Sequence, residues 1–391
     1  MERKRVSELA RQIRGVSYKP EDLHKNLDKN SVILLRANNI FEGKINFDDI
    51  VFVDKSKVSK DQYLRKDDIL ICASSGSKQL VGKASRVDFD DIECTFGAFC
   101  KVVRPNQDIA QYLNIYFQST NYRRKISEVA IGANINNIRN EHIDALELPV
   151  GIDSENAEVV ATVTVLQQII DRRKQQLQKL DELVKARFVE MFGAYPLNPM
   201  GWKKGTIRDV VADVRYGSSR PAVDGGKYPY LRMNNITYGG ELDLSDVKRI
   251  DVPENELEKC TVRRGDVLFN RTNSKELVGK TCVYDRDEMM VLAGFVIRVR
   301  VNDLVLPEFL SAFLNTEFSK RTLLGMCKAA IGQANINAQE MQSIGIYIPP
   351  IELQKEFVQF KNQTDKSKAA VQKALDEAQL LFDSLMQKYF G

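Results

Sequence analysis

The chain has 391 residues, of which 43% are hydrophobic and 28% charged, a balance typical of a globular protein large enough for two to four domains. Its 57 basic and 53 acidic residues leave a net charge of only +4, so composition alone does not indicate nucleic-acid binding. The sequence has no run of 18 or more apolar residues and no apolar signal segment, so we expect a cytoplasmic protein without membrane contact.

In chain order, each half of the sequence is predicted to form a mixed α/β segment followed by a long helix. Short apolar runs predict strands at 32–35, 69–72 and 99–103, and again at 230–233, 267–270 and 295–301. Shorter helices are predicted at 109–119 and 307–315, where Pro307 suits a first helical turn. We therefore predict an α/β domain at 1–153, a helix at 154–195, a second α/β domain at 196–350 and a helix at 351–391.

The second half of the chain repeats the first. Matching segments recur in one order at offsets of 196 to 201 residues, which indicates a duplication with a pseudo-twofold internal repeat. The pairs are Arg36-Ala37-Asn38-Asn39-Ile40 with Arg232-Met233-Asn234-Asn235-Ile236, Asp68-Ile69-Leu70 with Asp266-Val267-Leu268, Leu80-Val81-Gly82-Lys83 with Leu277-Val278-Gly279-Lys280, and Ile131 to Asn136 with Ile331 to Asn337, one residue being inserted in the last.

The two long helices carry apolar residues at alternating spacings of four and three. The series runs from Val159 to Met191 in the first helix and from Leu353 to Leu385 in the second, which is the seam pattern of a coiled coil. The alternative is a one-sided surface helix packed on its own domain. Thr364 and Ser367 are weak seam residues, so we expect looser pairing near the middle of the second helix.

Motifs for catalysis are weak in this sequence. Gly279-Lys280-Thr281 is similar to the end of a phosphate-binding loop, but Ser274 stands where the opening glycine belongs, so these glycines are better explained by tight turns. The only Pro-Pro pair, Pro349-Pro350, lacks the Asn or Asp and the aromatic residue of an adenine methyltransferase. Two histidines and six cysteines without a Cys-x-x-Cys pair argue against zinc. We expect no catalytic residue, metal or cofactor in this chain.

Short polar side chains stand at equivalent places in both halves and could read base edges. Asn and Gln pair with adenine, Arg with guanine, and Ser and Thr with either. The alternative is that they satisfy turn backbones: Asn38 and Asn234 could hold turns while Arg36 and Arg232 reach phosphate, and the Ala-Asn-Ile-Asn pairs could cap helices. The candidate DNA-contacting residues are Arg36, Asn38, Ser74, Ser75, Ser77, Lys78, Asn134, Asn136, Ser218, Arg220, Arg232, Asn234, Asn270, Arg271, Thr272, Asn273, Lys275, Asn335 and Asn337.

Three segments of the second half resemble the specificity subunits of type I restriction–modification systems. They are Gly226 to Ile236, the Arg264-Gly265-Asp266-Val267-Leu268 turn, and Ile346 to Gln354, where Pro349-Pro350-Ile351-Glu352-Leu353-Gln354 opens the last helix. The order of domain, helix, domain and helix is also the order of that family. The first half departs from the pattern, because 24–31 lacks the glycine and proline found at 225–229.

The resemblance implies a non-catalytic subunit that binds double-stranded DNA at a bipartite, asymmetric target. Two similar α/β target-recognition domains would each read one half, separated by two long antiparallel coiled-coil helices. These helices would fix the spacing and dock two methyltransferase subunits that carry the chemistry, and a motor-nuclease subunit would cut unmodified DNA where a system has one. The rival interpretations are an enzyme that carries methylation or cleavage itself, and a scaffold that binds peptides.

Overall fold

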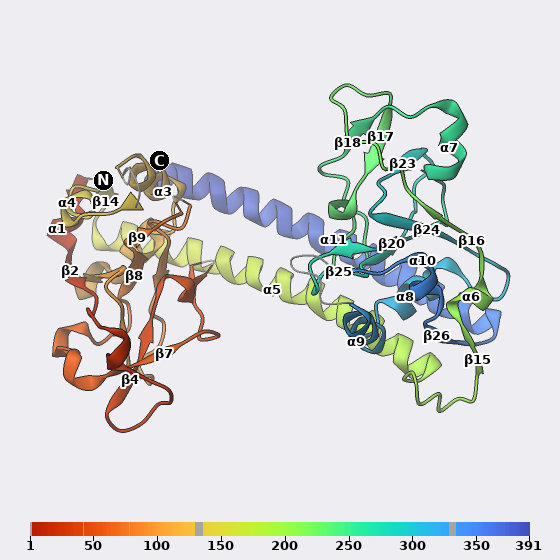
Figure 1. Ribbon diagram of the computed structural model, residues 1–391. Helices are drawn as coiled ribbons and strands as arrows, with labels where there is room; N and C mark the ends of the chain where they lie inside the picture. Colours follow the sequence, from red (N-terminus) through yellow and green to blue (C-terminus); the bar gives the residue numbers. More distant parts are fainter. Residues whose placement is uncertain (1, 42, 78, 130–135, 328–333) are drawn as a thin grey trace. The chain divides into compact units, whose positions relative to one another are not determined.

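The computed structural model describes residues 2–41, 43–77, 79–129, 136–327 and 334–391 (Figure 1). The chain divides into two compact units, of which unit 1 comprises Met1–Arg173 with Ala374–Gly391 and unit 2 comprises Lys174–Lys373. Each unit holds one mixed α/β domain and one segment of each long helix, α5 (Asp153–Phe192) and α11 (Ile351–Phe390). Within the described residues, no helix is long and apolar enough to cross a membrane.

The α/β domain of unit 1 is built on two four-stranded sheets. The first is antiparallel, in the order β10 (Ala84–Arg86), β8 (Ile69–Cys72), β12 (Cys100–Pro105), β2 (Ala10–Arg14). The second has the order β11 (Cys94–Phe96), β4 (Ser31–Leu35), β7 (Val51–Asp54), β3 (Leu23–His24), with β11 and β4 parallel. Two-stranded ribbons and short helices complete it: β1 (Glu2–Arg5) with β14 (Glu147–Val150), β9 (Ser74–Ser75) with β13 (Asn136–Asn137), β5 (Ile40–Phe41) with β6 (Lys44–Ile45), α1 (Val6–Leu9), α2 (Ala110–Tyr116), α3 (Thr120–Val129) and α4 (Asn140–Asp144).

Unit 2 repeats this plan. Its first sheet has the order β16 (Val211–Tyr216), β24 (Val296–Val301), β20 (Val267–Asn270), β22 (Thr281–Val283), which matches the first sheet of unit 1 strand for strand. Its second sheet places β23 (Met290–Leu292), β17 (Tyr228–Leu231) and β18 (Lys248–Ile250) in the order of β11, β4 and β7 but differs at both edges. There β19 (Thr261–Val262) pairs with β23, and no strand equivalent to β3 pairs with β18 among the described residues. The remaining elements are β15 (Lys203–Thr206) with β26 (Gly345–Ile348), β21 (Thr272–Asn273) with β25 (Ala334–Asn335), α6 (Ile207–Val210), α7 (Glu254–Cys260), α8 (Pro307–Leu314), α9 (Glu317–Met326) and α10 (Ala338–Gln342).

The predicted strands and helices agree with the structure apart from some ends. Strands β8 and β20 have the predicted bounds, and Pro307 stands in the first turn of α8 as predicted. The strand predicted at 230–233 ends earlier, at Leu231. It ends there because the side-chain oxygen of Asn235 accepts a hydrogen bond from the Arg232 backbone N–H at 2.8 Å, which turns the chain into a 3-10 helix.

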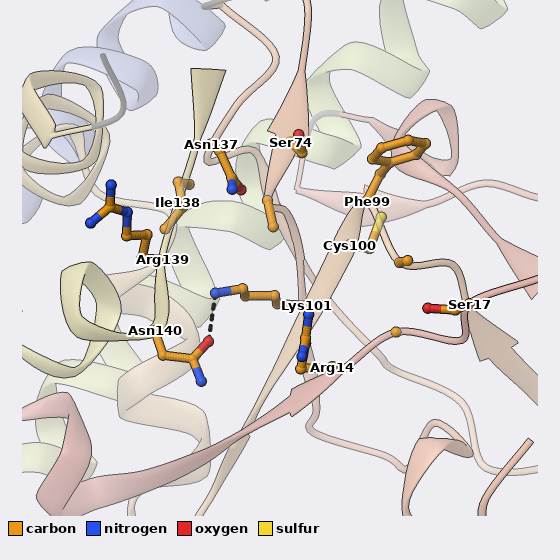
Figure 2. A pocket seen from close by; sticks show the side chains of 13 residues that line it. Arg14, Ser17, Ser74, Phe99, Cys100, Lys101, Asn137, Ile138, Arg139 and Asn140 are labelled. Carbon is orange, nitrogen blue, oxygen red and sulfur yellow. Dashed lines mark hydrogen bonds between the residues drawn. The ribbon is translucent and has the colours of Figure 1, made fainter. Parts of the chain in front are cut away.

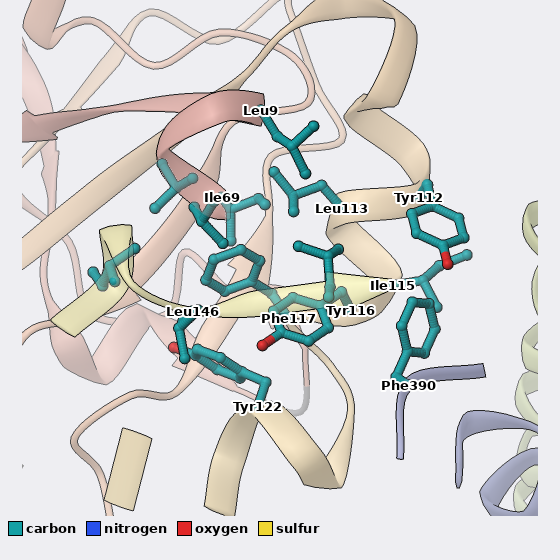
Figure 3. Close-up of a cluster of buried hydrophobic side chains, with 14 of the residues drawn as sticks. Leu9, Ile69, Tyr112, Leu113, Ile115, Tyr116, Phe117, Tyr122, Leu146 and Phe390 are labelled. Carbon is teal, nitrogen blue, oxygen red and sulfur yellow. The ribbon is translucent and has the colours of Figure 1, made fainter. Parts of the chain in front are cut away.

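A buried aromatic cluster joins the end of α11 to the domain of unit 1 (Figure 3). The Phe390 ring is fully buried, with its centroid 5.2 Å from that of Tyr112 and 5.8 Å from that of Tyr116. Val159 and Val163, near the start of α5, belong to the same core. Truncating a buried Phe to Ala typically costs about 3–5 kcal/mol, so these few contacts fasten the helix end firmly to the domain.

In unit 2 the same construction joins the end of α5 to the start of α11. The Phe188 and Phe192 rings lie 5.3 and 5.7 Å from that of Phe357, centroid to centroid, inside the domain core. Earlier on α5, Asp181 forms an ion pair at 2.6 Å with Lys368, which lies later on α11. An earlier residue of α5 thus contacts a later residue of α11. The two helix segments therefore pair antiparallel in this unit.

The buried face of α11 departs from the predicted seam. Ser367 is exposed, and Leu381, another predicted seam residue, is 50% exposed. The neighbouring residues take their places, because Lys368 reaches Asp181 and Phe382 packs against the core of unit 1. Phe357, Thr364 and Ala378 are buried as the four-three count predicts, so the shift by one residue is confined to 367 and to the last turns of the helix.

A buried ion pair explains why Asp68-Ile69-Leu70 recurs as Asp266-Val267-Leu268. Asp68 accepts two hydrogen bonds from Arg104, both at 2.7 Å, and Asp266 accepts two from Arg300, at 2.7 and 3.3 Å. Asp68 also accepts a hydrogen bond from the backbone N–H of Arg65, and Asp266 accepts one from the backbone N–H of Arg263. A buried carboxylate needs such partners, because an unpaired charge inside a protein is strongly unfavourable.

The glycines of the repeated Leu-Val-Gly-Lys segment serve tight turns, as predicted. Gly82 and Gly279 have φ of +79° and +78°, a conformation that residues with a Cβ rarely adopt. A Cβ at Gly82 would also lie 2.1 Å from a methyl carbon of Ile126. Lys280, which follows the second glycine, is buried and donates to the Met233 carbonyl at 2.8 Å.

Candidate nucleic-acid interface

The two polar loops expected to read DNA are held by the same backbone frame in both units. In unit 1, Ser74 and Ser75 pair with residues 136–137, and the Ala73 carbonyl accepts the Ile138 N–H at 2.8 Å. In unit 2, β21 pairs with β25, and the Arg271 carbonyl accepts the Ile336 N–H at 2.9 Å. The frame brings two segments that are distant in sequence onto one surface of each domain.

This frame corrects the alignment of the repeated asparagine motif. The hydrogen bonds make Asn137 equivalent to Asn335 and Arg139 equivalent to Asn337. The sequence comparison had instead placed Asn134 and Asn136 at these positions. Among these predicted residues, Asn134 lies outside the described part of the chain, as does Lys78, and only the backbone of 136 is described.

Asn337 caps a helix, as one of the two interpretations of its motif predicted. Its side-chain oxygen accepts the backbone N–H groups of Gln339 and Glu340, both at 2.9 Å, at the start of α10. Arg139 takes the equivalent place in unit 1, where it is exposed and forms an ion pair with Glu141 at 3.2 Å. Asn335, by contrast, lies exposed on the loop surface.

A hollow of about 500 Å³ opens beside the polar loop of unit 1 (Figure 2). Lys101 reaches across it and donates to the Asn140 side-chain oxygen at 2.6 Å. Burial lowers the pKa of Lys101, and the nearby positive charge of Arg14 lowers it further. Polar and cationic side chains from four segments meet here, namely Arg14, Ser17, Ser74, Lys101, Asn137, Arg139 and Asn140.

Of these lining residues, only Ser74 is among the candidates predicted from the sequence. Arg14 and Lys101 stand opposite each other on paired strands β2 and β12. Their proximity depends on strand register between segments far apart in the chain, which no local motif reveals. Of the two strands, only the one at 99–103 was predicted from the sequence, and the strand Ala10–Arg14 was not.

A second hollow of about 480 Å³ adjoins the first and contains Arg36, Asn38 and Ser74. Arg36 donates to Asp49 at 2.8 Å, and Asn38 donates to the same carboxylate at 2.7 Å. Asn38 therefore bonds within the turn through Asp49. The backbone of the turn is held by the buried neighbour Asn39, whose oxygen accepts the Arg36 N–H at 2.8 Å.

Unit 2 repeats this turn with the same assignment of roles. Asn235 is buried and donates to the carbonyls of Asp243 and Asp246, at 2.8 and 3.1 Å. Arg232 forms an ion pair with Asp246 at 2.7 Å. Asn234 is exposed, so here too the turn is held by the second asparagine of the pair and the prediction for the first is wrong.

Arg271 is the most firmly oriented cation of the unit 2 loop. Its guanidinium carbon lies 4.8 Å from the centroid of the Tyr216 ring, and Nη2 donates to the Asn335 side-chain oxygen at 3.0 Å. The Tyr216 hydroxyl in turn accepts the Ala338 N–H at 2.9 Å. A guanidinium held in this way keeps other donors available for a bidentate partner such as the guanine edge.

Several predicted contact residues of unit 2 are instead part of the scaffold. Asn270 is fully buried, and its oxygen accepts the Thr272 N–H at 3.2 Å. Thr272 and Ser218 are also buried, and the Ser218 hydroxyl accepts the Arg220 N–H. Because burial withdraws these three side chains from the loop surface, we do not propose them as direct DNA contacts, although Nδ2 of Asn270 has no hydrogen-bond partner among the described residues.

The other predicted residues remain on the surface. Arg220 is exposed and forms a two-bond ion pair with Glu256, and Lys275 is exposed on the loop after β21. Asn273 is half-buried, and its oxygen accepts the Ser274 N–H at 2.8 Å. Ser75 supports the turn that leads to the exposed Ser77, whose N–H it accepts at 3.2 Å.

No cluster of three or more histidine, cysteine, aspartate or glutamate side chains that could hold a metal ion occurs among the described residues. The cysteine thiols of this part of the chain are free, and burial raises the pKa of Cys94 and of Cys282 to about 12. Thiols with raised pKa values are poor nucleophiles at neutral pH, because the thiolate is the reactive form.

Comparison with known proteins identifies one family throughout. The model of the type I restriction modification DNA specificity domain matches twice, at residues 2–182 and 199–378. The specificity subunit of the type I restriction enzyme EcoKI from Escherichia coli strain K12 is 30% identical over 406 residues, which cover 98% of this chain and 87% of that subunit. The StySPI specificity subunit from Salmonella potsdam is 28% identical over 408 residues, with the same coverage.

Solved structures share the fold. A chain from a structural study of complex assembly and conformational transition of the type I R-M system has a TM-score of 0.56 at 17% identity, covering 100% of this chain and 97% of that one. The type I S subunit from M. genitalium has a TM-score of 0.53 at 13% identity, covering 100% and 96%. With the two family matches and the full-length relatives, the chain belongs to the specificity subunits of type I restriction–modification systems, the non-catalytic components that give these systems their DNA sequence specificity.

Proposed function

We propose that each α/β domain reads one half of a bipartite, asymmetric target in double-stranded DNA. One observation carries the proposal: the loop frames of the two units are the same while the side chains on them differ. Ala73-Ser74-Ser75 in unit 1 occupies the positions of Arg271-Thr272-Asn273 in unit 2. A shared scaffold with different polar side chains is what two readers of different sequences need.

We further propose that the two long helices separate the half-sites and dock two methyltransferase subunits, with a restriction motor-nuclease joining in systems that have one. The domain boundaries we assign are 1–153 and 196–350 for target recognition, and 154–195 and 351–391 for the helices. The aromatic clusters at Phe390 and Phe357 support a fixed geometry between helix and domain within each unit. We place the complex in the cytoplasm, where it would meet its DNA target.

Among the predicted residues, we propose that Ser74, Arg271, Asn273, Lys275 and Asn335 contact DNA directly. Arg36 and Arg232 would contribute from the neighbouring turns, each with a carboxylate partner that partly offsets its charge. Asn137, Arg139, Lys101 and Arg14 join the proposed surface of unit 1 because they share its hollow with Ser74.

Mapping of methylated bases in DNA from cells that carry this chain with its methyltransferase partners tests the proposal. We expect one sequence with two specified parts and an unspecified gap. Exchanging 73–75 for the residues at 271–273 should then alter one half of the sequence only. A methylation pattern without a bipartite motif, or a change in both halves, would contradict the proposal.

A further inference from the structure

One exposed phenylalanine occurs at the same place in each unit. Phe99 is 68% exposed and Phe295 is 53% exposed, each at the end of a turn that leads into the central strand of the first sheet. The turns are equivalent, because Cys100 N–H donates to the Gly97 carbonyl at 2.8 Å and Val296 N–H donates to the Ala293 carbonyl at 2.9 Å. A single exposed apolar side chain is ordinary, whereas the same ring exposed at both copies of one position requires a reason.

The backbone of each phenylalanine is fixed against the polar loop. The Phe99 carbonyl accepts the N–H groups of Ala73 and Ser74, at 2.8 and 3.0 Å, and the Phe295 carbonyl accepts that of Arg271 at 3.0 Å. Each turn also lies against a glycine, Gly15 in unit 1 and Gly217 in unit 2. The lack of a side chain at this glycine lets the two backbone segments approach closely. A Cβ at Gly15 would lie 2.1 Å from the Gly97 carbonyl oxygen, and one at Gly217 would lie 2.3 Å from that of Ala293.

The surroundings of the rings are polar and basic, which suits a polyanionic partner. Phe99 lines the first hollow of unit 1 together with Arg14 and Lys101 (Figure 2). It also lines the second hollow, which contains Arg36. In unit 2 the ring follows directly on residues 292–294, which hydrogen-bond the backbone of Ser218, and the Phe295 carbonyl itself accepts the Arg271 N–H. An apolar ring in such a setting matches the base-step wedges and stacking platforms that nucleic-acid-binding proteins place among cations.

A comparison of the two units distinguishes the exposed phenylalanine from the loop residues that are proposed to read sequence. The loop side chains differ at every position of 73–75 and 271–273, but the phenylalanine is the same in both copies. A side chain that reads a base should differ between two readers of different sequences. We propose that Phe99 and Phe295 each make an apolar contact with the bases or sugars of one half-site. This contact does not depend on the DNA sequence, and it positions the polar loop against the duplex.

This proposal rests on the proposed function, and its test uses the full chain with its methyltransferase partners. The probes are a duplex that carries the mapped target and a duplex of the same composition with the target scrambled. Affinity is measured for the wild type and for F99A, F295A and F295L over a series of salt concentrations. The matched control is L304A, because Leu304 is also exposed but follows the opposite end of strand β24.

We expect F99A and F295A each to weaken target binding about tenfold, as loss of a stacking aromatic does. The slope of affinity against salt should stay unchanged, because an apolar contact releases no counterions. The order of preference among single-base variants of the target should also stay unchanged. F295L should recover part of the loss, and L304A should bind as the wild type does. Thermal unfolding of each variant should match the wild type, since exposed rings contribute little to the core.

Each alternative outcome is distinct. Wild-type affinity in both alanine variants would overturn the inference, and so would loss of preference at one base pair, because the ring would then read sequence. A reduced salt slope would show that the variants lose phosphate contacts through a displaced loop, which also contradicts an apolar contact. If the wild type itself fails to distinguish target from scrambled duplex, the proposed function fails first, whatever the variants do.

Discussion

The guanidinium of Arg271 lies against the ring of Tyr216 with 4.8 Å between its central carbon and the ring centroid, while Nη2 donates to Asn335. Two contacts from different strands therefore orient this cation before DNA arrives. Orientation of this kind reduces the side-chain entropy that binding would otherwise remove. Arg271 is for this reason the residue of unit 2 in which we most expect sequence discrimination to reside.

We predict that R271A weakens discrimination at one base pair of one half-site by about 1–3 kcal/mol, the range for a bidentate Arg–guanine contact. Competition binding with all single-base variants of the target measures it. Y216F is the matched control, because it keeps the ring beneath the guanidinium and removes only the hydroxyl that accepts the Ala338 N–H. Equal losses for every sequence would mean that Arg271 contacts phosphate alone.

A second prediction concerns the buried pair of Asp68 and Arg104. D68N removes the close carboxylate partner of the buried Arg104 and leaves only Asp61, 3.9 Å away, which should lower the free energy of unfolding by about 3–5 kcal/mol. The double variant D68N/R104M removes both charges and should be more stable than D68N alone. Urea unfolding of the single and double variants measures both effects. If the loss of unfolding free energy in the double variant equals the sum of the losses in D68N and R104M, the two side chains are not coupled.

A third prediction follows from Lys320, which lies on α9 and donates to the Gly279 carbonyl at 2.9 Å. Burial lowers its pKa to about 8, and the nearby charges of Lys280 and Lys185 act in the same direction. The unfolded chain, with a pKa near 10.5, therefore binds more protons than the folded chain between pH 8 and 10.5. By linkage, the stability contributed by this group rises as the pH rises through that window and is lowest below pH 8.

The measurement is the free energy of unfolding of the wild type and of K320M at pH 7.5 and 9.5. The difference between the two proteins isolates Lys320 from other groups that titrate in this range. We expect the wild type to gain about 2 kcal/mol relative to K320M on going to the higher pH. A difference that does not change with pH would mean that Lys320 keeps an ordinary pKa.

Local patterns in the sequence predicted much of the fold. Apolar runs and turn residues located β8, β20 and α8 closely, and the repeated segments predicted two similar domains, because each repeat marks a turn or strand that both copies use. The four-three alternation predicted the two long helices. It misjudged the buried face of α11 at Leu381, because Phe382 fills the core of unit 1 better than its neighbour does.

The candidate surface was harder to predict, because it depends on contacts between distant segments. Arg104 and Arg300 lie 36 and 34 residues from their aspartates, and no motif joins them. Adjacent asparagines such as Asn38 and Asn39 look alike in sequence, and only the turn geometry gives the second one the structural role. The strand pairing that makes Asn137 equivalent to Asn335 likewise required the three-dimensional register.

The last prediction tests the long helices as a ruler between half-sites. Within unit 2 the pair of Asp181 with Lys368 fixes the antiparallel register of α5 and α11. Extending that register by five residues places Gln176 opposite Lys373, so an insertion at these two positions lengthens both helices at the same depth.

Seven residues inserted at both positions keep the buried faces in phase, since they add one heptad. At about 1.5 Å per residue the helices grow by roughly 10 Å. With a duplex rise of about 3.4 Å per base pair, this corresponds to about three extra pairs if helix and DNA run parallel. Methylation mapping should then find the same specified bases with a longer gap between them.

A five-residue insertion at both positions is the matched control, because it adds length but rotates the following part of each helix by about 140°, which puts the buried faces out of phase. We expect this variant to lose stability and target methylation, whereas the heptad variant keeps both. The heptad variant must be shown to fold and to bind DNA. If it does so and the gap in the mapped sequence is unchanged, the helices dock partners without setting the spacing.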